Sequence, residues 1–329
     1  MLALAASVAC SSEDGPSDAS GGQGGSGGSS GSPSAGGGNT STSDANVGSF
    51  SVTLNAAIGD ETPAYVSVLG KVYSWENPTN VIETPLISAN GCTAYKFSQQ
   101  ACIEVECSSS QRCAGPEDCQ ELPTLVSVGS VSLTGFDAGP LALTATNNNY
   151  QYPSDLAYPG FADGAALSLT ATGSHYPAFT ISTTGVAPME LNADTFFLAS
   201  GSPLLVEWVA GRNSAARVSL VLNMTKHGGS AGYLECDVPD SGSFTIPTTV
   251  LAELINLGVA GFPQLTATRH TQGTAAVPGG RIALNVASVA IPTLNVEGVC
   301  SCFDSSDCGS CSDGTKTVCD PVRRICNAP

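Results

Sequence analysis

The chain has 329 residues, of which 28 are Asp or Glu and 11 are Lys or Arg, so its formal net charge at pH 7 is -17. This charge disfavours nucleic acid and anionic membrane surfaces as partners. Only 12% of the residues are charged, and Gly, Ser, Thr and Val recur throughout, which predicts an all-β fold class rather than a helical one.

The N-terminal stretch MLALAASVA is a short apolar run that ends in small residues directly before Cys10. This pattern is typical of the end of a bacterial lipoprotein signal peptide, although Ser7 stands where such peptides usually carry Leu and no basic residue precedes the run. An ordinary chain terminus is the alternative. We expect residues 1–9 to be a signal-peptide remnant and Cys10 to be lipidated. The protein would then be an outer-membrane lipoprotein of the bacterial cell envelope, with its body exposed at the cell surface.

Residues 11–48 are rich in Gly and Ser and carry almost no apolar side chains. Such a segment buries too little surface to offset the entropy lost on ordering. Together with the lipidated cysteine, residues 10–48 are therefore predicted to form a disordered tether. The sequence has no run of 18 apolar residues, so it predicts no membrane-spanning helix.

From residue 49 onward, short segments alternate apolar and polar residues between Gly, Pro, Asn and Asp. This spacing predicts antiparallel β-sandwiches, with strands over 49–55, 65–75, 125–136, 141–147, 166–173, 178–183, 204–211, 217–225, 233–238, 243–247, 264–270 and 281–291. One short helix is predicted over 248–258, capped by Thr248 or Thr249 and ended by Gly258. We expect one sandwich over 49–174 and an immunoglobulin-like sandwich over 175–299, with a single sandwich as the alternative.

The period-two pattern assigns the core faces of three strands in the second half. The predicted inward residues are Leu204, Val206, Trp208 and Ala210, then Val218, Leu220, Leu222 and Met224, then Leu234, Cys236 and Val238. A buried tryptophan at Trp208 would match the core tryptophan of immunoglobulin-like sandwiches.

The sequence has 13 cysteines, which indicates an oxidising compartment in which they form disulfides. Five lie in an expected Cys-rich insertion over 92–119, namely Cys92, Cys102, Cys107, Cys113 and Cys119. Six lie in a small disulfide-rich tail over 300–329, namely Cys300, Cys302, Cys308, Cys311, Cys319 and Cys326. Because the insertion has an odd number, we expect Cys236 to pair with one of its members. Zinc binding at Cys308-x-x-Cys311 is the less favoured alternative, and no metal is predicted.

The stretches PLLVEWVAG, GYLECDVPDSGSFTIPTTVLAEL and QLTATRH, together with the segment around YPGFADG, resemble a pattern in predicted secreted lipoproteins of myxobacteria and their relatives. The resemblance covers residues 130–298 or so, and the Cys-rich tail is similar to tails in such proteins. It implies an envelope location and a β-sandwich body. It implies no activity, because none is established for that group.

One stretch spells a hydrolase motif, since residues 228–232 read GGSAG and match the G-x-S-x-G nucleophile elbow around Ser230. An elbow needs a helix after the serine, but a strand is predicted there, so the stretch reads as a hairpin loop. A catalytic triad would need His270 with Asp237 or Asp240. The three histidines, His175, His227 and His270, lack metal-ligand spacing and are expected in loops or at strand ends. We therefore expect no enzyme and no catalytic residue.

The aromatic loop over residues 147–164 is a more plausible functional feature than the GGSAG stretch. Its candidate ligand-binding residues are Tyr150, Tyr152, Asp155, Tyr158 and Phe161. Aromatic rings beside acids can bind sugars, and the acids could hold a structural calcium ion, the one cofactor considered. The favoured alternative is that the tyrosines pack on the sandwich edge. The leading prediction is a structural or binding role, with a membrane reached through the lipid anchor and an envelope glycan or envelope protein as partner.

Overall fold

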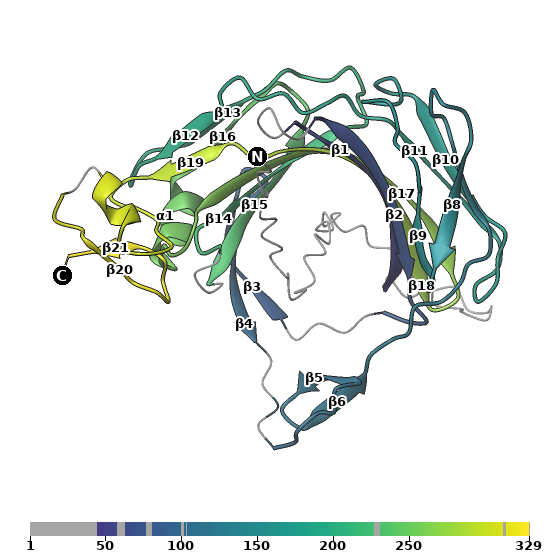
Figure 1. Cartoon of the computed structure of the whole chain (residues 1–329), viewed down its shortest axis with the longest axis horizontal. Coiled ribbons are helices and arrows are strands. Elements are labelled where there is room, and N and C mark those ends of the chain that lie inside the picture. Colours follow the sequence, from purple (N-terminus) through teal and green to yellow (C-terminus); the bar gives the residue numbers. More distant parts are fainter. Residues whose placement is uncertain are drawn as a thin grey trace, which may run out of the picture. The chain divides into compact units, whose positions relative to one another are not determined.

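The computed structural model describes residues 45–57, 63–76, 81–99, 102, 104–226, 231–311 and 314–328 (Figure 1). The predictions for residues 1–44, including Cys10, and for His227 and Ser230 fall outside these ranges. The described chain is mostly β-strand with one short helix and a disulfide-rich C-terminal segment, which confirms the predicted all-β class.

The elements of the described residues are, in chain order, β1 (Asn46–Asn55), β2 (Tyr65–Val72), β3 (Val81–Ala89), β4 (Cys92–Gln99), β5 (Gln111–Gly115), β6 (Asp118–Glu121), β7 (Val131–Thr134), β8 (Leu141–Thr146), β9 (Asn149–Gln151), β10 (Ala166–Ala171), β11 (Phe179–Thr184), β12 (Thr195–Leu198), β13 (Leu204–Glu207), β14 (Arg217–Asn223), β15 (Gly232–Pro239), β16 (Ser243–Ile246), α1 (Thr248–Asn256), β17 (Gln264–Val277), β18 (Gly280–Ala290), β19 (Thr293–Val296), a 3-10 turn (Asp307–Ser310), β20 (Val318–Cys319) and β21 (Cys326–Asn327).

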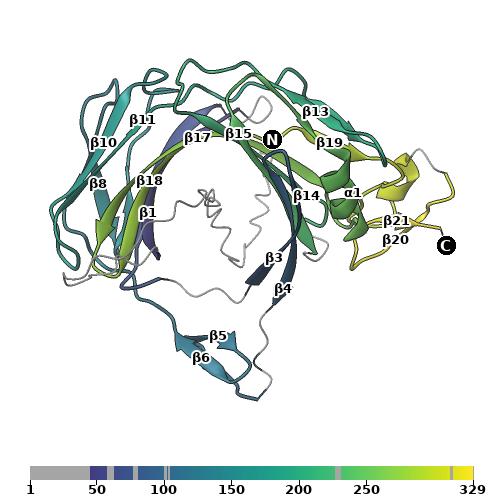
Figure 2. The same cartoon turned by 180° about the vertical axis from the view of Figure 1, so that it is seen from behind.

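Thirteen of these strands form one sheet in the order β11-β10-β7-β8-β9-β2-β1-β18-β17-β14-β15-β4-β3. Neighbouring strands are antiparallel except β1 and β18, which pair in parallel. Figures 1 and 2 show β17 and β18 as long, curved strands, and they lie next to each other in the middle of the sheet. The predicted hairpin between residues 217 and 238 is confirmed, because β14 and β15 pair antiparallel.

The first core forms where the sheet bends back on itself. β11 packs against β17 and β18, and buried side chains from both layers meet between them. Its members include Phe50, Leu133, Leu169, Ile181 and Leu284. Apolar residues at every second position of each strand produce this arrangement, because successive side chains of a strand point to opposite faces.

The second core lies between β4, β14, β15 and β17 on one side and a cover of smaller elements on the other. The cover consists of the β12–β19 pair, the β13–β16 pair and α1, whose Val250, Leu251 and Leu254 are buried. All the predicted inward residues of this region are buried except Ala210, which is exposed because β13 ends at Glu207. Trp208 is buried in this core, as the immunoglobulin-like interpretation predicts.

Each half of the chain contributes to both cores. The first core includes Ile282 and Leu284 of β18, and the second includes Cys92 and Ala94 of β4. The segments 49–174 and 175–299, expected as separate sandwiches, therefore share one sheet through the β1–β18 and β15–β4 pairings.

The helix begins and ends close to the predicted bounds, but its N-cap differs. Pro247 occupies the cap position with φ -66, and no side chain caps the helix, so neither Thr248 nor Thr249 has that role. Proline suits this end because it fixes φ and has no amide hydrogen to satisfy. Gly258 has φ +104 just beyond the helix, where glycine permits the chain to turn away, as predicted.

The expected Cys-rich insertion over 92–119 is shorter than predicted, because Cys92 begins strand β4 of the large sheet. The remaining four cysteines of the group form the disulfides Cys102–Cys113 and Cys107–Cys119 around the β5–β6 hairpin. The tail closes with Cys300–Cys311, Cys302–Cys319 and Cys308–Cys326, which form a small core of their own.

Candidate binding face of the large sheet

The structure places two residues of the aromatic loop in the first core. Tyr150 is only 1% exposed, and its hydroxyl accepts a hydrogen bond from the Val128 amide at 2.8 Å and donates one to the Gly129 carbonyl at 3.0 Å. Phe161 is buried edge-on against Phe136, with ring centroids 5.3 Å apart. Neither ring can meet an external ligand, so the packing alternative holds for these two residues.

The other loop candidates remain partly accessible. Tyr152 and Asp155 line a shallow depression of about 250 Å³ beside Ser67 and Leu69 of β2. Tyr158 is partly buried, and this burial, with the nearby negative charge of Glu190, raises the pKa of its hydroxyl. Of the acids in this loop, Asp163 accepts hydrogen bonds from the amides of Ala187 and Arg212, one at each carboxylate oxygen.

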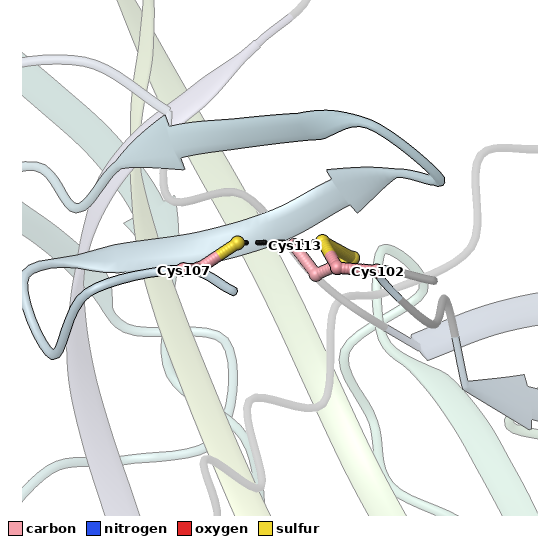
Figure 3. A group of neighbouring side chains, drawn as sticks. All are labelled: Cys102, Cys107 and Cys113. Atoms are coloured by element: carbon pink, nitrogen blue, oxygen red, sulfur yellow. Dashed lines mark hydrogen bonds between the residues drawn. A yellow bond between two sulfur atoms is a disulfide. The ribbon is translucent and has the colours of Figure 1, made fainter. Parts of the chain in front are cut away.

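The described cysteines also bear on the metal question. Three clusters of sulfur atoms lie close enough together to surround an ion, and Figure 3 shows one of them, formed by Cys102, Cys107 and Cys113. Cys102 is bonded to Cys113, and its sulfur lies 3.3 Å from that of Cys107, which is bonded to Cys119. Zinc binds thiolates. Because every sulfur of the three clusters belongs to a disulfide, none of them is a thiolate.

Of the residues considered for a catalytic triad, Asp240 lies in a buried environment, whereas Asp237 and His270 are partly exposed. Asp240 is buried and accepts hydrogen bonds from Trp208 at 2.7 Å, Gly211 at 2.9 Å and Arg269 at 2.8 Å. His270 lies in the middle of β17 rather than at a strand end, because the strand continues to Val277. Its Nε2 lies 3.4 Å from the Asp237 carboxylate, so these two residues do meet, while Ser230 lies outside the described residues.

One face of the large sheet points away from both cores, and we name it the open face. It consists of the alternate residues of β3, β4, β15, β14, β17, β18, β1 and β2 that face away from buried neighbours such as Leu234 and Cys236. In the described part of the chain, α1 and the strand pairs β12–β19 and β13–β16 pack on the opposite, core side. Figures 1 and 2 show the open face on the inner side of the curved sheet.

Polar residues stand opposite one another in rows across the open face. Asp237, Ser219 and Thr268 occupy paired positions on β15, β14 and β17, and Arg217 is paired with His270. The rows continue onto β18, β1 and β2 through the polar residues Asn285, Ser51, Thr53, Asn55 and Ser67, with the apolar Ala287 and Val289 between them. Hydroxyl, amide and carboxylate groups are thus spread across this face, interrupted by apolar side chains such as Leu69.

An acidic-aromatic patch occupies the end of the open face on β3, β4 and β15. It comprises Glu83, Tyr95, Phe97, Tyr233 and Glu235. Tyr95 and Tyr233 stack with centroids 5.0 Å apart, and Phe97 lies 5.2 Å from Tyr233. Tyr233 donates a hydrogen bond to Glu83 at 3.1 Å. The sequence carries the signal for part of this patch, because Tyr233 and Glu235 alternate with the core residues of YLECDV.

The carboxyl groups beside this patch have pKa values that move in opposite directions. Burial raises the pKa of Glu235, the negative charge of Asp237 raises it further, and a hydrogen bond from Ser219 at 3.3 Å opposes both. Burial alone would raise the pKa of Asp237, but the His270 side chain 3.4 Å from its carboxylate and the hydrogen bond from Arg217 outweigh it and hold the pKa below its ordinary value. Burial and the charge of Glu83 raise the pKa of Tyr233, which therefore remains a donor.

Replacing Glu235 by glutamine should stabilise the protein near pH 7 by less than about 1 kcal/mol, a bound set by its partial exposure. A carboxyl whose folded pKa is raised contributes stability below its unfolded pKa, and this stability is lost as the pH rises through the folded pKa. Glutamine removes the charge, so the difference from wild type should vanish near about pH 4. Thermal unfolding of the wild type and of Glu235→Gln at pH 7 and at about pH 4 measures this difference in stability.

Asp237→Asn is the matched control for Glu235→Gln. Because the pKa of Asp237 is lowered, its stabilising contribution is present at neutral pH and lost as the pH falls through the folded value. This variant should therefore be less stable than wild type near pH 7. If both variants changed the stability in the same direction at neutral pH, this would contradict the conclusion that the pKa of Glu235 is raised and that of Asp237 is lowered.

Comparisons with known proteins leave the chain without an assigned family. No family model matches it, and no curated protein matches it. Among solved structures, the crystal structure of the chicken CNTN1 FN1-FN3 domains covers 70% of this chain and 72% of its own length, at 10% identity and a TM-score of 0.18. A likeness at this TM-score carries no argument. Within the described residues, no helix is long and apolar enough to cross a membrane.

Proposed function

We propose that this protein is a lipid-anchored protein of the bacterial cell envelope that has a structural or binding role and no catalytic one. The observation that carries the proposal is the pairing of all twelve described cysteines in six disulfides. Such bonds persist in oxidising compartments outside the cytoplasm. An anchor at Cys10 and a tether over 10–48 would hold the folded body away from the membrane surface.

The binding surface that we propose is the open face. It is a broad, half-exposed array of hydroxyl, amide, carboxylate and aromatic groups, and the disulfide-linked sheet holds these groups on regular strands. Sites on strands keep their geometry better than sites on loops. The aromatic loop is the weaker candidate, because Tyr150 and Phe161 are core residues.

Lipid labelling and fractionation of cells that make the full chain test the location. Wild-type protein should incorporate labelled palmitate, remain with the membrane fraction and show no reactive thiol before reduction. Cys10→Ala should lose the label and leave the membrane fraction while keeping its six disulfides, and Ser11→Ala should behave as wild type. Unlabelled wild-type protein in the cytoplasm with reactive thiols would contradict the proposal.

A further inference from the structure

The acidic-aromatic patch carries negative charge that the described residues do not neutralise. On this part of the face, Arg217 pairs with the Asp237 carboxylate at 2.7 Å, and the His270 side chain lies 3.4 Å from the same carboxylate. Glu83 and Glu235 make no ion pair with any described Lys or Arg. Their hydrogen-bond partners are hydroxyl groups, Tyr233 for Glu83 and Ser219 for Glu235. A ligand group with positive charge would therefore complement the patch.

The rings of the patch add a second chemical preference. Tyr95, Tyr233 and Phe97 pack on one another and are all partly exposed, so they form an apolar strip held in place by mutual contact. Rigid aromatic side chains supply contact area at a low cost in conformational entropy. Carboxylates and hydroxyls border this strip. Together they suit a ligand that has both C–H surfaces and many hydroxyl groups, which is the surface of a sugar ring.

We propose that the open face binds a glycan that carries free amino groups, with these groups at Glu83 and Glu235 and the sugar rings along the aromatic strip. The rows of Ser, Thr and Asn on β14, β17, β18 and β1 would then hydrogen-bond further sugar units. The inference rests on the proposed function and names the ligand class of the same face. Acidic polysaccharides are disfavoured, because the chain carries a net charge of -17 and the patch is itself acidic.

Titration calorimetry on the full chain at about pH 6, where amino groups are protonated, tests the proposal with a glucosamine hexamer. The N-acetylglucosamine hexamer has the same length without the charge, and hexalysine has the charge without the sugar. The glucosamine hexamer should bind at least about tenfold more tightly than either control. Equal binding of the two hexamers, equal binding of hexalysine, or no binding of the glucosamine hexamer would overturn the proposal.

Variants test whether the glucosamine hexamer binds at the acidic-aromatic patch. Glu83→Gln combined with Glu235→Gln should remove the preference for the glucosamine hexamer over its acetylated counterpart, whereas Asp118→Asn combined with Glu121→Gln makes the same charge change on β6 and should preserve it. Tyr233→Ala should weaken glucosamine hexamer binding at least about tenfold. Tyr233→Phe retains the ring and is the control for a loss of folding in Tyr233→Ala. It should bind the glucosamine hexamer more tightly than Tyr233→Ala does. A preference that survives the double Glu variant would overturn the assignment.

This test is independent of the test of location. Binding is measured on purified protein, and lipid labelling and fractionation are measured on cells. Failure to bind the glucosamine hexamer would leave an envelope location intact. A cytoplasmic location would refute the proposed function even if the hexamer bound.

Discussion

Replacing Cys92 and Cys236 together by alanine should lower the free energy of unfolding by about 4–5 kcal/mol, the chain-entropy value for a loop of this length. Cys92 and Cys236 form a disulfide, which confirms the prediction that Cys236 pairs with a cysteine of the 92–119 segment. This disulfide joins residues 144 positions apart, so its removal frees more of the unfolded chain than the loss of any other disulfide described. The two residues stand directly opposite each other on β4 and β15, and both are buried in the second core. Replacing both avoids leaving a free thiol.

Urea unfolding followed by tryptophan fluorescence measures this effect, because Trp208 lies in the same core as the disulfide. The control is the pair Cys107→Ala and Cys119→Ala, whose bond closes a separation of 12 residues in the β5–β6 hairpin. That hairpin contributes no described residue to either main core, so the control should leave the main transition unchanged. A loss below about 1 kcal/mol for the Cys92 and Cys236 pair would mean that sheet pairing alone holds β4 in place.

The strands that could be predicted are those in which alternation is regular. In residues 217–223 and 233–238 every second residue is apolar, and those residues are the ones that the structure buries. The pattern is local, because the face on which a side chain lies depends only on its place in the strand. The sequence therefore predicts the inner and outer faces of these strands, including the positions of Tyr233, Glu235 and Asp237.

Strands β3 and β4 were not predicted, although one signal was present. Asn90 and Gly91 connect them, with φ values of 52 and 79, and an Asn-Gly pair is a strong hairpin signal. Because Cys92 is close in sequence to four further cysteines, the residues of β4 were predicted to belong to the Cys-rich insertion instead. Two of the aromatic members of the patch, Tyr95 and Phe97, were missed for this reason.

Pairings between strands that are far apart in the chain could not be predicted from one sequence. One of them determines that Tyr150 of the aromatic loop is buried. Tyr150 is buried because β9 pairs with β2, which sets its ring 5.6 Å from that of Phe50. Nothing local distinguishes this tyrosine from one on a surface loop. The parallel pairing of β1 with β18 is of the same kind, because it joins residues more than 200 positions apart in the chain.

Replacing Asp240 by asparagine should destabilise the protein by about 3–5 kcal/mol, because it leaves the buried charge of Arg269 without its partner. The side chains of Arg269 and Asp240 are 1% and 3% exposed. Arg269 also donates to the carbonyl groups of Ala187, Pro188 and Val209, which ties β17 to the cover of the second core. Arg269→Met should cost a similar amount, since it leaves a buried carboxylate with only Trp208 and Gly211 as donors.

A double-mutant cycle separates the pair from its surroundings, because the double variant should lose much less stability than the sum of the two single changes. The same chain supplies the control in Arg217 and Asp237, an Arg–Asp pair with a similar distance of 2.7 Å but side chains 45% and 40% exposed. Solvent screens that pair, so its coupling should stay below about 1 kcal/mol. If the two cycles gave equal coupling energies in urea unfolding, burial would not be what makes the Arg269–Asp240 pair matter. A larger coupling for the buried pair would show that the interaction between Asp240 and Arg269 stabilises the second core.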